Sequence, residues 1–251
     1  MSKITRREFA TTILSSLASF ALVDMLSSLR AFAGVAHQPA LRLRKELEEI
    51  AQQLRKKQTT PVEWQAQIER KMMSADLPDL LSYLDLDHLE RALTLPNSGA
   101  AFKRFPFGAG EELAYTTQIF GMKKGCAIVP HGHHNLVSAH TVIGGELHLR
   151  NFERLRDEDS HMILEPMVDR TISLRDCSSQ SSMHNNVHWF TAITPTAYTF
   201  DVIVDVLDPQ QQSGRDFVDV TNAEKLGNGT LRARVIDRQE ATRIYGTEMH
   251  H

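Results

Sequence analysis

The most informative part of this chain is Pro130-His131-Gly132-His133-His134, followed by Val142-Ile143-Gly144-Gly145-Glu146-Leu147. On a β-strand, residues i and i+2 project from the same face, so His131 and His133 can point two imidazoles into one pocket. Neutral imidazole nitrogens suit zinc, iron, nickel and copper. Eight of the twelve histidines lie between His131 and His188. This clustering predicts a metal site.

Beyond Gly99, short runs rich in Val, Ile, Thr, Phe and Tyr alternate with turn residues, as expected for an all-β region. Many short antiparallel strands that carry a metal-binding face predict a cupin-type jelly-roll barrel over residues 99–210. The pattern weakens from Gly214, so we expect residues 211–251 to pack on the barrel or to be partly disordered. The strands that we expect are 113–120, 126–129, 140–143, 146–152, 170–174, 186–193 and 198–206, with 230–236 as a further candidate.

Residues 34–98 predict an α-helical extension that precedes the barrel. Apolar residues recur at helical spacing over 41–58 among Arg, Lys and Glu. Thr60-Pro61-Val62-Glu63 begins a second helix, with Thr60 as the N-cap and Glu63 at the third position, which should end near Ser74. A leucine-rich third helix is expected over 79–93. These leucines predict a small helical layer packed on something larger, or alternatively a helix that binds a partner.

The N-terminus predicts export. Thr5-Arg6-Arg7-Glu8-Phe9 is a twin-arginine pattern, a modestly apolar stretch follows over 10–23, and Ala31-Phe32-Ala33 places small residues where a signal peptidase requires them. We therefore expect residues 1–33 to be a Tat-type signal, cleaved after Ala33, that delivers a periplasmic or otherwise exported protein through the Tat machinery. Two alternatives stay open: an amphipathic helix with a chance Arg-Arg, and an uncleaved signal that anchors the protein.

The composition excludes several classes of function. The formal net charge of −3 and the lack of a long basic run give no nucleic-acid footprint. Nucleotide chemistry and nucleophilic hydrolysis lack support, because the chain has no Gly-rich phosphate loop and no G-x-S-x-G elbow. Cys126 and Cys177 do not resemble a disulfide framework, although they could pair in an oxidising compartment. A homodimer is possible, since cupins often pair.

Two segments resemble a family. Pro-His-x-His, eleven intervening residues and Gly-Glu-Leu are similar to the first cupin motif, with Gly145 closing a turn between strands. That motif usually has a glutamate ligand four or five residues after the second histidine, where this chain has Val137 and Ser138. The segment 186–195, Asn-Val-His-Trp-Phe-Thr-Ala-Ile-Thr-Pro, together with 201–209 after it, resembles a segment of cysteamine dioxygenase and the plant cysteine oxidases.

The resemblance, which covers roughly residues 100–210, implies a ligand set and an activity. Those thiol dioxygenases keep His-x-His without the glutamate and take a third histidine from the later segment. The implied Fe(II) ligands are therefore His131, His133 and His188, and the implied substrates are O2 and a thiol. The sequence departs from the family at Gly132, at His134 and at 208–211, where Asp-Pro-Gln-Gln replaces Pro-Pro-Tyr. These departures concern the substrate more than the metal.

The chemistry of three histidines leads to the same hypothesis. Three neutral imidazoles leave Fe(II) with its full +2 charge and about three open positions, where a thiolate and O2 can meet. We expect both oxygen atoms to enter the thiol and give a sulfinate. The alternative is a non-redox cupin with Zn, Mn or Ni that binds, isomerises or senses a small polar molecule, since zinc also accepts three histidines and a water.

His140 and Tyr198 are the candidate catalytic residues outside the ligand set. On one uninterrupted strand His140 would face away from His131 and His133, and a single bulge would reverse that. Tyr198 and Tyr115 could hydrogen-bond dioxygen or substrate, or could be packing residues. His184 is the best substitute for the third ligand.

The remaining candidates are expected to lie outside the pocket or along its edge. His134 should point to the opposite face from His133. His148 and His161 are expected at the surface or beside the ligands, and His250 and His251 at a disordered chain end. Trp189 is expected in the core or in the pocket wall, and Cys126 as a small buried hydrophobe or a modulator of the site.

Overall fold

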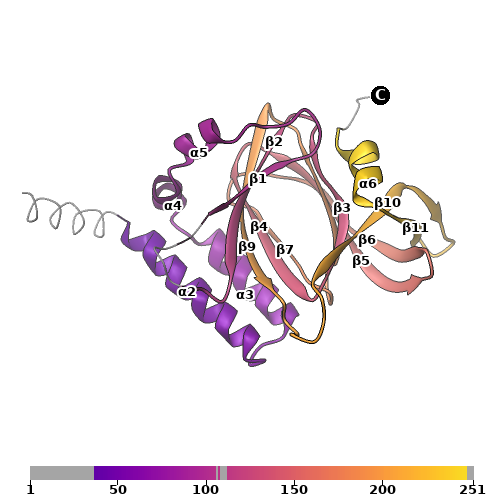
Figure 1. The fold of residues 1–251 in the computed structure, drawn as a ribbon, viewed down its shortest axis with the longest axis horizontal. Coiled ribbons are helices and arrows are strands. Elements are labelled where there is room, and N and C mark those ends of the chain that lie inside the picture. Colours follow the sequence, from indigo (N-terminus) through magenta and orange to yellow (C-terminus); the bar gives the residue numbers. More distant parts are fainter. Residues whose placement is uncertain (1–36, 106, 108–111, 248–251) are drawn as a thin grey trace, which may run out of the picture.

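The computed structural model describes residues 37–105, 107 and 112–247 (Figure 1). The expected Tat signal, with its cleavage point after Ala33, lies outside the described residues, and so do His250 and His251. Within the described ranges, no helix has both the length and the apolar character needed to cross a membrane.

In the described ranges, four helices precede the strands and a fifth follows them. The capping box predicted at Thr60 is confirmed: the Thr60 hydroxyl accepts from Glu63 N–H, and the Glu63 carboxylate accepts from Thr60 N–H. The third expected helix is interrupted at Asp85, whose φ of 49° ends one helix and begins the next. The helices are α2 (Gln38–Arg55), α3 (Pro61–Met73), α4 (Leu77–Leu84), α5 (Leu86–Ala92) and α6 (Arg238–Tyr245).

Eleven strands make up the described β-structure. Seven of these strands were expected from the sequence, with shorter or shifted bounds, and β11 corresponds to the further candidate over 230–236. The strands β1, β7 and β10 were not expected. The strands are β1 (Ala101–Phe105), β2 (Thr116–Lys123), β3 (Ala127–His134), β4 (Leu136–Gly144), β5 (Leu147–Glu158), β6 (His161–Ile172), β7 (Cys177–Gln180), β8 (Val187–Ala192), β9 (Thr196–Asp205), β10 (Gly214–Lys225) and β11 (Leu231–Ile236).

The strand order confirms the predicted jelly roll. One sheet has the order β1-β2-β9-β4-β7, and the other contains β6-β5-β8-β3. The antiparallel pairs β2·β9, β3·β8, β4·β7 and β5·β6 are those of one long hairpin rolled into two facing sheets. This is the double-sheet jelly roll in which cupins are built. The predicted turn at Gly145 is also confirmed, because this glycine, with φ of 69°, separates β4 from β5.

The C-terminal segment is more ordered than the sequence suggests. β10 pairs with β3 and β11 with β6, so β10-β11-β6-β5-β8-β3 close into a second barrel. Its apolar core includes Trp189, Val218 and Tyr245, and α6 packs there against β3 and β10 (Figure 1). The described part of 211–251 therefore completes the fold, because its alternating side chains close this core.

The helical extension covers the outer face of the first sheet. Trp64, Ile68 and Leu80 are fully buried in one cluster with Phe200 and Val202 of β9. Each large apolar side chain buried in this way contributes about 1.5–3 kcal/mol to stability. The leucines of the extension are thus core residues, as the first of the two interpretations predicted.

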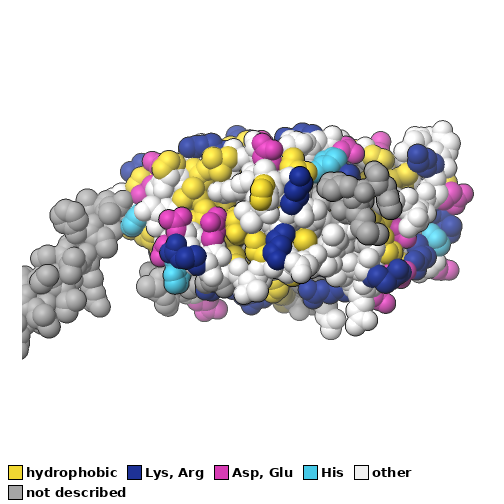
Figure 2. Space-filling model, turned by 90° about the horizontal axis from the view of Figure 1, so that it is seen from above, with side chains coloured by type: hydrophobic (Ala, Val, Ile, Leu, Met, Phe, Trp, Pro, Cys, Tyr) yellow, Lys and Arg dark blue, Asp and Glu magenta, His cyan; other side chains and the backbone are white. Residues whose placement is uncertain are grey.

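The two cysteines lie in different clusters. Cys126 and Cys177 are both free and buried, so they do not form the disulfide that was left open. Burial raises the pKa of the Cys177 thiol to about 12. Basic and acidic side chains are interspersed on the face drawn in Figure 2, in keeping with the small net charge.

Candidate metal centre

The interior between the two sheets has two halves. The apolar half is built from Ile128, Val142, Leu147, Leu149 and Phe190. The polar half, further along the same strands, holds His131, His133, His188, His140, Asp201, Ser138, Asn151 and Gln180, all of them buried. A cluster of this many buried polar groups is costly unless the groups satisfy one another or bind a ligand.

An irregularity in β3 points two histidines into the polar half. Ile128 belongs to the interior cluster and Val129 to the second barrel's core. The register with β8 shifts between Ile128 and His131. Pro130 lies in this shift, where a residue without an N–H does not break the ladder. After the shift His131 and His133 face inward, and His131 pairs directly with His188 of β8.

The three predicted ligands converge. Their ligand nitrogens all lie within 4.8 Å of one another. His131 Nε2 and His133 Nε2 are 3.1 Å apart, and the His131 and His188 ring centroids are 4.3 Å apart. Two nitrogens about 2.1 Å from one ion and at right angles to each other would be separated by about 3.0 Å. The cluster therefore fits a metal ion.

The hydrogen-bonding pattern of the His131 and His188 rings leaves ring nitrogens available for a metal ion. His131 Nδ1 lies 2.8 Å from the Val129 carbonyl, to which it donates, so its Nε2 keeps a lone pair. Both ring nitrogens of His188 are buried without a hydrogen-bond partner among the described residues. A buried ring nitrogen left in this way costs free energy, which metal coordination would recover.

Burial keeps all three rings neutral. It lowers the pKa of His131 to about 3, and it lowers those of His133 and His188 well below their usual range, with the neighbouring imidazoles acting in the same direction on the last two. A metal binds only the unprotonated ring. The site therefore presents three lone pairs at neutral pH.

Ser138 occupies the position where the cupin motif usually carries glutamate, and its side chain faces the ligands. Its Oγ is 3.3 Å from His133 Nδ1. A hydroxyl at this position can accept from His133 Nδ1–H, which leaves His133 Nε2 for the metal. Ser138 thus orients the ligand His133, whereas a glutamate at this position would itself bind the metal.

His140 extends this contact away from the ligands. Its Nε2 is 3.2 Å from Ser138 Oγ, and its Nδ1 is 2.9 Å from Asp201 Oδ2, although the ring N–H is not well aligned with that oxygen. With its proton on Nδ1, the His140 ring accepts from the Ser138 hydroxyl through Nε2. His133, Ser138, His140 and Asp201 then form one continuous chain of polar contacts.

His140 faces the ligands because of a turn and not because of a bulge. Asn135, with φ of 57°, separates β3 from β4, and the two strands belong to opposite sheets. Neither the uninterrupted strand nor the bulge that the sequence analysis considered is present between His133 and His140. The Asn135 side chain fixes this turn, since it donates to the carbonyls of Asp208 and Gln211 and accepts from Asp208 N–H. The 208–211 segment that departs from the family thus supports the turn between β3 and β4.

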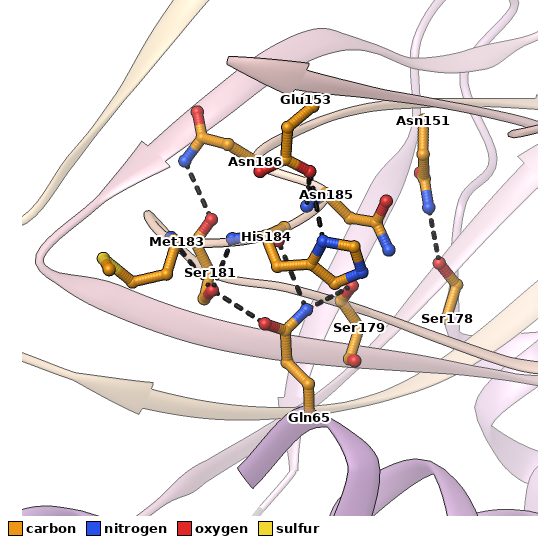
Figure 3. Close-up of polar contacts among 10 residues, drawn as sticks. All are labelled: Gln65, Asn151, Glu153, Ser178, Ser179, Ser181, Met183, His184, Asn185 and Asn186. Carbon is orange, nitrogen blue, oxygen red and sulfur yellow. Dashed lines mark hydrogen bonds and ion pairs between the residues drawn. The ribbon is translucent and has the colours of Figure 1, made fainter. Parts of the chain in front are cut away.

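A second network holds the loop between β7 and β8 (Figure 3). Asn186 donates to the carbonyls of His133 and Ser181, at 2.6 and 2.9 Å. The Ser181 hydroxyl donates to Gln65 of α3. A Cβ at Gly132 would lie 2.5 Å from Asn186 Oδ1, so only glycine leaves room for this clamp. The departure at Gly132 therefore has a packing reason.

Tyr198, one of the two proposed catalytic residues, lies away from the centre. It is buried in the cluster beneath the helices, on the outer face of β9. Asp201 faces inward on the same strand, and residues three apart on a strand face opposite ways. Tyr198 is a packing residue, because its spacing from Asp201 turns it outward.

The other candidates also lie outside the ligand cluster. The His184 ring pairs with Glu153 at 3.1 Å and does not replace His188 (Figure 3). Tyr115 donates to the Arg44 carbonyl, and Trp189 packs on Tyr245 in the second barrel. His134 points away as predicted and contacts Asp216. His148 lies beside Asp169, and His161 beside Ser160.

Sequence reasoning missed several residues of the polar half as members of the site. Asp201 lies in the segment that resembles the family, but the sequence analysis gave it no role. Asn151, Ser178 and Gln180 were not considered. Asp201 could have been found as a carboxylate inside the buried run 197–204. The others lie on strands whose register the sequence does not reveal. Asn151 pairs with His188, and its amide donates to Ser178 Oγ.

Fold and site together fit a metal-binding cupin. No protein-family model matches the sequence, and no curated protein matches it. The fold class therefore rests on the strand order, and the metal site on the histidine geometry.

Several solved structures are similar at low identity. Procruciferin, an 11S globulin from Brassica napus, is 9% identical with a TM-score of 0.35 over 49% of this chain, which spans only 29% of the globulin. KdgF from Halomonas sp. is 16% identical with a TM-score of 0.33, over 45% of this chain and 84% of that one. An uncharacterized protein with a double-stranded β-helix domain from Klebsiella pneumoniae is 13% identical with a TM-score of 0.37, over 51% and 87%.

Proposed function

We propose that this protein is a non-haem Fe(II) thiol dioxygenase that converts a small thiol or an N-terminal cysteine into a sulfinate. The observation that carries the proposal is the ligand set: three buried, neutral imidazoles with a serine where a carboxylate ligand would stand. A site without a carboxylate stays more cationic than the facial triad of other Fe(II) oxygenases, which favours an anionic sulfur ligand.

The reaction is balanced without a further reductant. A thiol R–SH and O2 give the sulfinic acid R–SO2H, so both oxygen atoms join the sulfur. Fe(II), when bound, supplies the redox chemistry that lets O2 react with a coordinated thiolate. His131, His133 and His188 would hold the metal.

The neighbouring residues position the ligands and shape the pocket. The Ser138 hydroxyl fixes the His133 ring, and Asp201 holds His140 against Ser138. Phe190 lies 5.2 Å from the His140 ring and 5.3 Å from the His188 ring, between the site and the apolar half, where it excludes water.

Metal analysis and oxygen uptake test the proposal. Protein purified without oxygen should contain iron and should consume O2 with cysteamine, cysteine or a peptide with an N-terminal cysteine. With labelled dioxygen, both product oxygens should carry the label. Tightly held zinc, and no uptake with any thiol, would instead favour the non-redox cupin with Zn, Mn or Ni.

We also propose that the chain is exported by the Tat machinery to the periplasm or beyond. The support is the twin-arginine pattern at residues 5–9. Replacing Arg6 and Arg7 by lysine should keep the protein in the cytoplasm of a Tat-competent host. Unchanged export of that variant would overturn this part of the proposal.

A further inference from the structure

The loop between β7 and β8, residues 181–186, joins the two sheets beside the metal centre. β7 is the outermost strand of the first sheet, next to β4, and β8 lies in the second sheet, next to β3. β4 carries Ser138 and His140, whereas β3 and β8 carry the three predicted ligands. The position of this loop therefore affects how the residues of one sheet meet those of the other.

Two side chains of α3 hold the first-sheet end of this loop (Figure 3). Gln65 Nε2 donates to the carbonyls of Ser179 and His184, at 3.0 and 3.3 Å. Gln65 Oε1 accepts from the Ser181 hydroxyl at 2.7 Å. One turn along the helix, the Glu69 carboxylate accepts from Ser179 N–H at 2.9 Å and from the Ser179 hydroxyl at 2.7 Å. Gln65 is only 3% exposed, so breaking its hydrogen bonds would leave buried polar groups unpaired.

One route leads from α3 through the loop to the ligand His133. The Ser181 hydroxyl donates to Gln65, and the Ser181 carbonyl accepts from Asn186 Nδ2 at 2.9 Å. The same Asn186 nitrogen donates to the His133 carbonyl at 2.6 Å. Ser181 and Asn186 are both buried. Because every contact in this route is direct, a shift of Gln65 would be passed on to the backbone of a ligand.

A second route leads from α3 through β7 to the ring of the same ligand. Ser179 contacts Gln65, and the next residue, Gln180, pairs with Ser138 of β4. Ser138 Oγ is 3.3 Å from His133 Nδ1. The first route therefore ends on the backbone of His133 and the second on its imidazole, so both the place and the orientation of this ligand depend on α3.

We propose that Gln65 and Glu69 are positioning residues of the metal centre, which makes the helical extension a part of the site as well as its cover. The proposal rests on the metal-binding part of the proposed function and adds the element that keeps His133 in place. Ligands must be held within about 0.5 Å of their working geometry, which requires supporting side chains that are themselves fixed by packing and hydrogen bonds. The two routes supply such support.

Titration of the metal-free protein with Co(II), whose visible spectrum reports its coordination, tests the proposal. Gln65→Met keeps the length of the side chain and removes its hydrogen bonds to the loop. We expect Co(II) to bind about 10-fold more weakly, the lower end of the range for the loss of an outer partner, and the spectrum to change. Gln67→Met makes the same exchange on the same helix, where Gln67 contacts Thr59, and should alter neither quantity.

A second pair of variants does the same for Glu69. Glu69→Met removes the acceptor of Ser179 N–H and should weaken Co(II) binding in the same direction as Gln65→Met. Glu69→Gln keeps an acceptor oxygen at this position and should restore the affinity and the spectrum of the wild type. Equal losses in both Glu69 variants would overturn the positioning role of this residue.

Two further variants separate positioning from a general loss of stability. Ile68→Val shortens a fully buried side chain of the same helix and destabilises the protein without changing a polar contact of the loop. It should leave the affinity for Co(II) and the spectrum unchanged. Ser181→Ala removes one hydroxyl from the first route and should weaken Co(II) binding, and it takes the place of Gln65→Met if that variant fails to fold.

A double-mutant cycle with Asn186→Ala tests whether Gln65 acts through the loop. Because the two residues share a route, the combined loss of Co(II) affinity should be smaller than the product of the two single losses. Losses that multiply in full would overturn the proposal. Wild-type affinity and spectrum in Gln65→Met would also overturn it.

These measurements need neither O2 nor a thiol, so their result is separate from that of the proposed function. A Gln65-dependent affinity for Co(II), in a protein that takes up no O2 with any thiol, would keep the positioning role and remove the dioxygenase. O2 uptake by the wild type, together with an unchanged affinity and spectrum in Gln65→Met, would do the reverse.

Discussion

The apolar half and the polar half of the jelly-roll interior are built by the same strands. β8 contributes Phe190 to the first and His188 to the second, and β4 contributes Val142 and His140 in the same way. The apolar half stabilises the barrel by burial, whereas the polar half gives up part of that stability to hold groups that can bind a metal. Position along a strand therefore separates stability from chemistry.

Removing a ligand should separate the two halves most clearly. We expect His188→Asn to weaken metal binding by on the order of 100-fold or more, since loss of a ligand exceeds the loss of an outer partner. The barrel should stay folded, because the apolar half is intact. Metal content after dialysis and circular dichroism check both points. His184→Asn, which alters the nearby histidine outside the cluster, should keep its metal.

The opposite result is expected in the apolar half. Leu147 is fully buried there, and Leu147→Ala should cost about 2–5 kcal/mol of unfolding free energy. Chemical denaturation measures this loss, and Leu155→Ala on the exposed part of β5 is the control. Metal affinity per folded molecule should be unchanged. A matching fall in metal affinity would show that the two halves are not separable.

His140 lies between these extremes, because it touches the ligand layer without being a ligand. We expect His140→Gln to lower turnover by about 10- to 100-fold, the usual effect of removing an outer partner, while the metal content is kept. The pH profile of turnover should also change. Loss of metal in this variant would instead make His140 a ligand.

Acid should destabilise the metal-free polar half selectively. The unfolded chain binds protons below pH 6.5, whereas His131 in the folded protein does so only near pH 3. Stability should therefore be complete above pH 6.5 and fall between these values, by up to about 1.4 kcal/mol per pH unit for each such histidine. Melting temperatures across this range measure the slope. It should be smaller in His188→Asn, and an equal slope would show that the buried histidines do not cause the acid sensitivity.

The smallest effect is expected outside both halves. Tyr198→Phe removes a hydroxyl from the cluster beneath the helices, so activity should stay within about 2-fold and stability within about 1 kcal/mol. Steady-state rates and denaturation curves check this. A tenfold loss of activity would place Tyr198 in the reaction after all.

The sequence revealed those parts of the site that depend on local spacing. His131 and His133 follow from the period of a strand, and the capping box at Thr60 follows from the helix-start pattern. Long-range register was harder to predict. The sequence did not show that Asn135 sends β3 and β4 into opposite sheets, or that Asp201 meets His140. It also underestimated β10, whose strand pattern becomes clear only when β3 lies beside it.

The sheet that carries His131 and His188 separates the metal centre on one face from the apolar core of the second barrel on the other. Val129, Val187 and Trp189 alternate with the ligands and face the second barrel. We expect a change in the size of any of these three side chains to bend the sheet and move the imidazoles, although none of the three belongs to the ligand set. Selection for the geometry of the metal centre therefore also constrains the side chains of the second barrel's core, on the opposite face of the same sheet.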